Sequence, residues 1–239
     1  MIKSVSYSRL IDFEQCKLRA KMKHVDRIPE ETHPAATRGT AIHQMAEDFV
    51  RGKGQSLPTE LLHFDDEFVA MRREFKAGNV SLEGDWGFDK NWEVTDYKSA
   101  WLRMKADLVY FPSKTHAIVV DHKSGGSWGK EVTHGEQVQL YCIATLLRYP
   151  LLQSVRGELW YLDKDELTYK TYTRAEALRY LQPMDKRMKR VTSATEFPAN
   201  PNIFTCKYCS YGPAKGGQCP VGVLSVGETS MKQYRRKFG

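Results

Sequence analysis

Two aspartates and a lysine in the segment 104–124 are the residues whose types and spacing best suit chemistry: Asp107, Asp121 and Lys123. Asp121 and Lys123 are two positions apart in strand-like sequence, and side chains at i and i+2 of a strand project from the same face. Asp107 lies 14 positions before Asp121, across a short polar stretch that suits a hairpin turn. We therefore expect a compact cluster of two carboxylates and one ammonium.

This cluster suits hydrolysis of a phosphodiester. Two carboxylates offer the hard oxygen ligands that Mg²⁺ or Mn²⁺ prefers, and water and substrate phosphate would fill the other positions. The reaction needs an activated water and stabilisation of the charge on phosphorus and on the leaving oxygen. Lys123 could orient the water, lower its pKa or neutralise the oxyanion, and the sequence leaves these roles open. The alternative without catalysis is a strand-end ion pair between Asp121 and Lys123.

Two strands are expected to carry these residues, at 103–111 and 116–122, with a hairpin loop at 112–115. The second strand is apolar on both faces where it precedes Asp121, which indicates a central strand. Two more strands are expected at 155–162 and 167–173. Residues 51–100 show no clear pattern, although they are rich in aromatic residues.

Helical patterns flank these strands. The expected helices are 5–24, a helix from Thr40 that carries His43 in its first turn, 136–149, and a basic helix from the capping box of Thr173 and Glu176 to about residue 191. Pro183 is expected to kink or split the last of these. The pattern predicts an α/β fold in which a central mixed sheet is flanked by helices.

The composition favours a polyanionic partner. The net charge is +7 and the pI is about 9.1, and basic side chains placed near phosphates release condensed counterions. No stretch approaches the roughly 18 apolar residues of a membrane span, and the N-terminus lacks the apolar core of a secretory signal. We therefore expect a soluble, intracellular protein that binds a polyanion and not a membrane.

Several stretches together resemble a known family. "MKADLVYF" and "IVVDHKSGG" are similar to the two catalytic strands of the PD-(D/E)XK nuclease superfamily, in particular its RecB-like branch, while "RGTAIHQMAEDFV" and "QVQLY" resemble that branch's histidine helix and Q-x-x-x-Y motif. The resemblance implies a restriction-endonuclease-like core. It also implies that His43, Asp107 and Asp121 bind the metal, with the backbone carbonyl of His122.

The same motif assigns roles to Gln137 and Tyr141. They are four positions apart and so share a helix face, from which an amide and a phenol could contact DNA phosphate or order Lys123. Ala106 departs from the proline of the family name, at a position that holds no ligand. An acidic residue is also expected upstream of the hairpin, and either Glu83 or Glu93 could supply it.

The cysteines suggest a second metal site. Cys206 and Cys209 have the spacing that lets two sulfurs converge on one metal, and Cys219 follows in a turn-rich stretch. "FEQCKLRAKMKH" resembles the segment that carries the upstream cysteine of iron-sulfur members of the RecB-like group, which implies that Cys16 completes a 4Fe-4S site. Structural Zn²⁺ is the main alternative. Cys142 lies in an apolar helical pattern and is expected in the core.

We expect one nuclease domain over residues 1–239. Within it, 1–50 holds the N-terminal helices, 101–173 the catalytic core, and 197–239 a Cys-rich segment, tied to the N-terminal helices, with a basic tail. The expected function is DNA hydrolysis, exonucleolytic on single strands or ends, in recombination, repair or replication, as in a phage or accessory nuclease. A CRISPR-adaptation nuclease that trims DNA and a non-catalytic DNA-binding scaffold are the alternatives. A protein partner or a homo-oligomer is possible.

Overall fold

The computed structural model describes residues 1–30, 34–126 and 129–223, so the basic tail lies outside the described residues. The chain divides into two compact units. The central unit is His33–Asp185, and the terminal unit combines Met1–Thr32 with Lys186–Gly239. The boundary falls within helix α6 (Arg174–Ser193). The expected division at 1–50, 101–173 and 197–239 stays a prediction.

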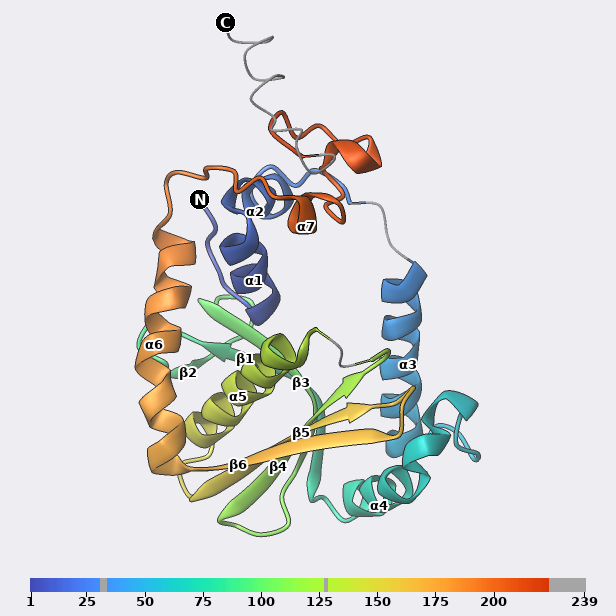
Figure 1. Cartoon of the computed structure of the whole chain (residues 1–239). Helices are drawn as coiled ribbons and strands as arrows, with labels where there is room; N and C mark the ends of the chain where they lie inside the picture. Colours follow the sequence, from blue (N-terminus) through green and yellow to red (C-terminus); the bar gives the residue numbers. More distant parts are fainter. Residues whose placement is uncertain (31–33, 127–128, 224–239) are drawn as a thin grey trace, which may run out of the picture. The chain divides into compact units, whose positions relative to one another are not determined.

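The central unit is built on a six-stranded sheet in the order β2-β1-β3-β4-β5-β6. Its strands are β1 (Val80–Phe88), β2 (Val94–Thr95), β3 (Leu102–Tyr110), β4 (His116–Lys123), β5 (Ser154–Tyr161) and β6 (Glu166–Thr173). The pair β4 and β5 is parallel and the other neighbours are antiparallel. The mixed sheet expected from the sequence is therefore present, and the apolar strand β4 lies in its interior (Figure 1).

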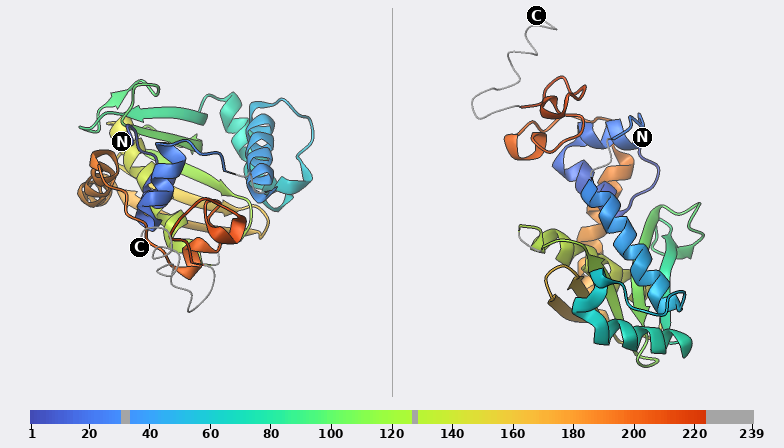
Figure 2. Two further views of the ribbon diagram at one scale, coloured as in Figure 1. Left: turned by 90° about the horizontal axis from the view of Figure 1, so that it is seen from above. Right: turned by 90° about the vertical axis from the view of Figure 1, so that its right-hand side faces the viewer.

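Helices cover both faces of this sheet. Helices α3 (Pro34–Arg51) and α4 (Asp65–Lys76), with the short helix η1 (Thr59–Phe64), pack together against one face, where Phe68 joins Val120 and Trp160 in an apolar core. Figure 2 shows α3 and α4 side by side. Helix α5 (Glu131–Arg148) packs on β4 and β5, where Val138 contacts Leu159 and Tyr161. The fold class predicted from the sequence is thus confirmed.

Two of the helices predicted in the N-terminal half have different boundaries in the structure. Helix α3 begins at Pro34, not at Thr40, whose hydroxyl instead donates to the carbonyl of Ala36 at 3.1 Å within the helix. The expected helix 5–24 is two helices, α1 (Tyr7–Gln15) and α2 (Lys17–His24). They part at Cys16, whose extended backbone (φ −160°, ψ 112°) breaks the helical path.

Helices in the C-terminal half follow the prediction more closely. The capping box at the start of α6 is present, since Glu176 accepts the Thr173 backbone N–H at 2.9 Å and the Thr173 hydroxyl accepts the Glu176 N–H at 3.3 Å. Helix α6 continues through Pro183 as one helix, so the helix is not split there. Helix α5 begins five residues earlier than its predicted start at residue 136, at Glu131.

Residues 51–100, which had no clear pattern, supply α4, β1 and β2. Several of their aromatic side chains are core residues. Trp86 and Trp92 are buried, and the Trp92 indole N–H donates to Asp185 at 3.0 Å. This cluster of aromatics therefore stabilises the central unit through burial and a satisfied indole.

The terminal unit adds the short helices α7 (Ile203–Cys206) and η2 (Pro213–Lys215) to α1 and α2. A buried carboxylate organises its N-terminal helices. Asp12 lies 3.0 Å from His24, 3.2 Å from Arg19 and 3.3 Å from Lys23. Burial opposes ionisation of Asp12, but these three partners outweigh it and hold the pKa of Asp12 below its usual value. Among the described residues, no helix is long and apolar enough to cross a membrane.

Close contact between α5 and β5 depends on a glycine. A Cβ atom at Gly157 would lie 2.7 Å from the Cys142 sulfur and 3.2 Å from Val138. Cys142 is fully buried, as its helical pattern predicts, and burial raises the pKa of its thiol. It therefore acts as a small core side chain whose size is matched to Gly157.

We expect Gly157→Ala to lower the free energy of unfolding by about 1–3 kcal/mol, because the added methyl overpacks this contact. Combining it with Cys142→Ala should cost less than the sum of the two single changes, since the smaller side chain makes room. Urea unfolding of the four proteins measures this coupling. Strictly additive losses would contradict it.

Candidate active site

Strands β3 and β4 carry the residues from which the site is built. Their pairing runs from Tyr110 opposite Ile118 to Leu108 opposite Val120. One residue further on each strand stand Asp107 and Asp121, so the two aspartates come to the same place along the sheet. There the Asp107 carboxylate accepts the backbone N–H of His122 at 2.7 Å. The backbone N–H of His122 therefore donates to a side chain, whereas regular strand pairing would direct it to a backbone carbonyl.

Lys123 is held by two partners on the face of the sheet that α5 covers. Its ammonium lies 2.5 Å from the Asp121 carboxylate and donates to the Gln137 side chain at 2.9 Å. The Gln137 amide in turn donates to the Tyr141 hydroxyl at 2.9 Å. The structure therefore brings Asp121, Lys123, Gln137 and Tyr141 into one chain of contacts, in which Gln137 lies between Lys123 and Tyr141.

His43 reaches the same cluster from α3. Its Nδ1 atom lies 3.1 Å from Asp107 Oδ1, while Nδ1 of His122 lies 3.9 Å from Asp107 Oδ2. Each of His43, Asp107 and His122 offers one possible ligand atom, and these atoms lie within 4.8 Å of one another. The three side chains therefore form a candidate metal centre. The sequence assigned His122 a role through its carbonyl, whereas the structure brings its imidazole to the group.

The chemistry of these donors fits a divalent cation. Burial lowers the pKa of His122 to about 4, so its imidazole is neutral at physiological pH, the form that binds metals. Burial would raise the pKa of Asp107, but His43 and His122 hold it below its usual value. The Nε2 atom of His122 is buried and has no hydrogen-bond partner among the described residues.

Asp121 is the electrostatically strained member of the cluster. Burial is the main cause that raises the pKa of Asp121 to about 6. The Lys123 ammonium opposes this shift, and repulsion from Asp107 adds to it. Its side chain is almost completely buried. A cation close to both aspartates would relieve that repulsion and favour the ionised form.

The register of β1 and β3 indicates which of Glu83 and Glu93 is the expected upstream acidic residue. Leu82 pairs with Leu108 and Gly84 with Ala106, so the position of Glu83 in β1 is opposite Asp107. The side chain of Glu83 lies outside the described part of the structure. Glu93 is an exposed residue in the turn between β1 and β2. The backbone therefore favours Glu83.

Two contacts near the site were not found from the sequence. Arg38 of α3 makes a two-pronged pair with Asp163, in the turn between β5 and β6, at 2.7 and 2.8 Å. His134 of α5 lies 3.1 Å from the Tyr161 hydroxyl. Both pairs join positions far apart in the chain, so no local sequence signal marks them.

The four cysteines expected to bind one metal or cluster all lie in the terminal unit. Cys16, Cys206, Cys209 and Cys219 line one pocket, together with Arg19 and Met22. The Asn200 N–H donates to the Cys16 sulfur at 3.4 Å, and none of these cysteines is in a disulfide. Burial raises the pKa of Cys209 and Cys219. Thiolates are ligands of both zinc ions and iron-sulfur clusters. Among the described residues, however, the group whose ligand atoms lie close enough together to hold a metal is the one at His43.

The chain belongs to the PD-(D/E)XK nuclease superfamily, whose family model matches residues 4–104 and 66–214. No curated protein matches it. Among solved structures, a candidate exonuclease from Eubacterium rectale is similar, with 14% identity, a TM-score of 0.51 and coverage of 96% of this chain and 92% of the other. An alkaline exonuclease from Laribacter hongkongensis has 13% identity, a TM-score of 0.41 and coverage of 80% and 86%. The first likeness shows a shared fold.

The raised pKa of Asp121 predicts that this residue destabilises the metal-free fold at neutral pH. Its pKa is higher in the folded state than in the unfolded chain, so stability is lost as pH rises from about 4 through about 6. In chelator at pH 7.5, we expect Asp121→Asn to raise the free energy of unfolding by about 2 kcal/mol.

Urea unfolding between pH 4 and pH 8 measures this effect, and the gain should shrink as pH falls. Asp85→Asn is a matched control, because Asp85 is an exposed carboxylate of β1 that pairs with Lys105 at 3.1 Å. An Asp121→Asn protein that is less stable than the original chain at pH 7.5 would contradict the sign of the effect.

Proposed function

We propose that this protein is a divalent-metal-dependent DNA nuclease of the RecB-like branch. It acts as an exonuclease on single strands or DNA ends, in recombination, repair or replication. The strongest support is that Asp107, Asp121 and Lys123 lie together with His43 where β3 and β4 stop pairing, in a chain that belongs to a nuclease superfamily.

The contacts support a role for each residue of the site. Asp107 and Asp121 would hold the cation, with His43 as a further ligand. Lys123 is kept in place by Gln137 and by its ion pair with Asp121. It neutralises charge that develops on the phosphate oxygens. Tyr141 supports this arrangement through Gln137.

The ligand set favours Mn²⁺ over Mg²⁺. Imidazole nitrogen suits transition metals, whereas Mg²⁺ is bound mainly by oxygen. His43 and His122 both present imidazoles to Asp107. When bound, the cation would polarise the phosphate and an attacking water.

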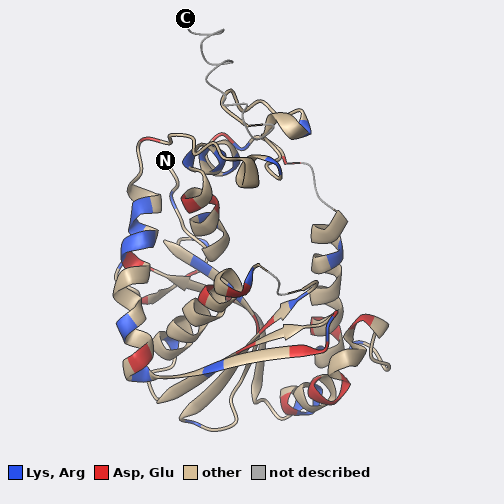
Figure 3. Cartoon of the chain, viewed as in Figure 1, with Lys and Arg blue, Asp and Glu red and all other residues tan. Residues whose placement is uncertain are grey.

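Basic side chains in the terminal unit suit contacts with the DNA backbone. The C-terminal half of α6 carries Lys186, Arg187, Lys189 and Arg190 (Figure 3). Arg187 is held by Glu14 at 2.7 and 2.8 Å. Such a surface gives affinity without sequence preference, because it contacts phosphates only.

The nuclease proposal is tested with labelled linear and closed circular DNA. We expect linear DNA to be degraded with Mn²⁺, less with Mg²⁺ and not with chelator, and closed circles to resist. Asp121→Asn and Lys123→Met should each lower the rate by roughly 100-fold or more. Asp85→Asn should retain the rate, since its carboxylate lies outside the site.

Cleavage that persists in chelator, or that Asp121→Asn leaves unchanged, would exclude the proposed mechanism. Equal cleavage of closed circles would replace the exonuclease by an endonuclease.

We further propose that Cys16, Cys206, Cys209 and Cys219 bind a 4Fe-4S cluster, with zinc as the alternative for the same thiolates. Support comes from their place around one pocket of the terminal unit. The bound group would link α1 and α2 to the C-terminal segment and stabilise their folding together.

Anaerobically purified protein should be brown, with absorbance near roughly 400 nm. Cys206→Ala should remove this absorbance, while Cys142→Ala should keep it, because Cys142 is buried within α5. Colourless protein with one zinc per chain would identify the alternative. Protein that binds neither metal would refute the site.

A further inference from the structure

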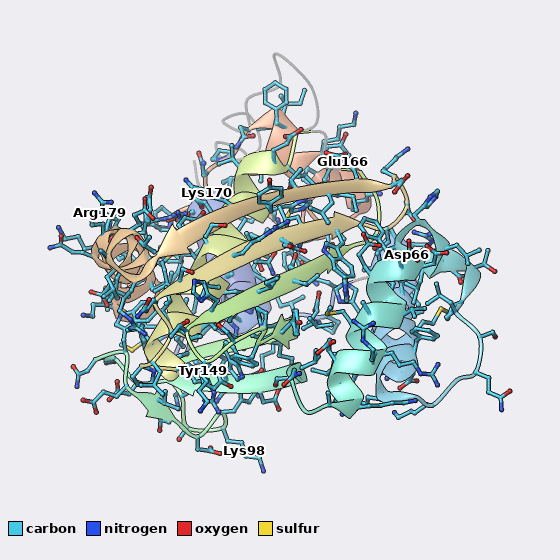
Figure 4. The ribbon with its side chains drawn as sticks, turned by 90° about the horizontal axis from the view of Figure 1, so that it is seen from below. Asp66, Lys98, Tyr149, Glu166, Lys170 and Arg179 are labelled. Carbon is cyan, nitrogen blue, oxygen red and sulfur yellow. The ribbon has the colours of Figure 1, made fainter. Side chains whose placement is uncertain are left out.

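A pocket beside the candidate active site has no role in the chemistry described so far. It lies between α5 and the strands β5 and β6, and its volume is about 380 Å³. Leu159 and Tyr161 of β5 and Val138 of α5 line it. Its outer wall is β6, the last strand of the sheet, along which Figure 4 shows Glu166 and Lys170.

A glycine in a helix is part of the pocket wall. Gly135 of α5 lines it, and a Cβ atom at this position would meet nothing within 4 Å. Glycine inside a helix costs about 1 kcal/mol relative to alanine. Gly135 thus lowers the stability of the helix at a position with room for a larger side chain, which indicates that the open space has a function.

Tyr161 joins this pocket to the catalytic lysine. Tyr161 and Lys123 are register partners on the parallel strands β4 and β5, so their side chains lie next to each other on the same face. From β4, the strands β5 and β6 are reached in steps of about 4.8 Å. A group joined to a phosphate at Lys123 can therefore enter the pocket.

Charges around the pocket disfavour a second phosphate. Glu131, Glu136 and Glu166 line it, whereas Lys170 is the lysine among the lining residues. His134, whose ring contacts the Tyr161 hydroxyl, adds no cation, because burial and the nearby Lys123 lower its pKa to about 4. The carboxylates do not form a metal site either, since the metal-ligating group found among the described residues is the one at His43.

These surroundings suit a nucleobase. Tyrosine rings and aliphatic side chains offer the contacts on which unpaired bases stack. Carboxylates accept hydrogen bonds from the exocyclic amino groups of cytosine, adenine and guanine, which thymine lacks. We propose that this pocket is a subsite that binds one unpaired base of the DNA strand next to the cleaved phosphate, with preference for a base that carries an amino group over thymine. This inference rests on the proposed nuclease function.

Binding of short single-stranded oligonucleotides tests the subsite apart from cleavage. Fluorescence anisotropy in Ca²⁺ would compare oligonucleotides that carry one abasic position, moved stepwise along the strand. At one position, loss of the base should weaken binding to the original chain by about tenfold. Oligo-dC and oligo-dA should bind more tightly than oligo-dT.

Gly135→Leu fills the pocket from a position with free space, so the fold is expected to persist. We expect this variant to bind the intact strand as weakly as the original chain binds the abasic one, and to be insensitive to the abasic position. Its kcat/KM should fall by a similar factor through KM, with Mn²⁺ binding unchanged. Val132→Leu is the matched control, because Val132 is an exposed position of the same helix.

The subsite is refuted if Gly135→Leu binds DNA normally, or if the abasic effect persists in that variant. Absence of cleavage together with the expected binding differences would refute the nuclease and keep the base subsite. Normal cleavage with no effect of any abasic position would do the reverse.

Discussion

The hydrogen bond from the His122 backbone to the Asp107 carboxylate is the contact on which the candidate site depends. Alternation along β4 sends Asp121 and Lys123 to the face under α5, and His122 to the face under α3 and α4, where its ring meets Phe68 and Trp160. Asp107 lies where β3 and β4 stop pairing. It can therefore contact His43 and His122 while its charge acts on Asp121.

This arrangement concentrates charge in a buried place. Asp107 and Asp121 are close enough to repel each other. His43 and His122 outweigh the cost of burial at Asp107, whereas Lys123 and His43 compensate for only part of that cost at Asp121. The helices on both sides fix the cluster against that cost, through the apolar core around Trp160 and the α5 contact at Gly157. Stability and ligand binding are thus opposed at one residue, Asp121.

Local patterns predicted what local physics determines. The alternation of β3 and β4, the capping box at Thr173 and the burial of Cys142 each follow from neighbouring residues, and the structure contains all three. The start of α3 was missed because six further residues before Thr40 also adopt helix, although they carry no apolar stripe. Whether the candidate residues act in catalysis stays a prediction.

Two contacts between distant segments had no signal in the sequence. The pair of Arg38 with Asp163 and the pair of His134 with Tyr161 depend on how helices meet the sheet. The imidazole of His122 was likewise unassigned, because alternation alone turns it away from Asp121. Only the folded strand shows that Asp107 lies within reach of both faces.

The terminal unit has a consequence for synthesis of the chain. Its first part ends at Thr32 and its second begins at Lys186, so the early helices leave the ribosome long before their partners exist. The central unit can fold meanwhile, since its strands and helices are contiguous in the chain. Cys16 must wait as a reduced thiol, in a nascent segment without its core, until the last three cysteines emerge. Assembly of that pocket is therefore a late event, completed after translation of the candidate catalytic residues.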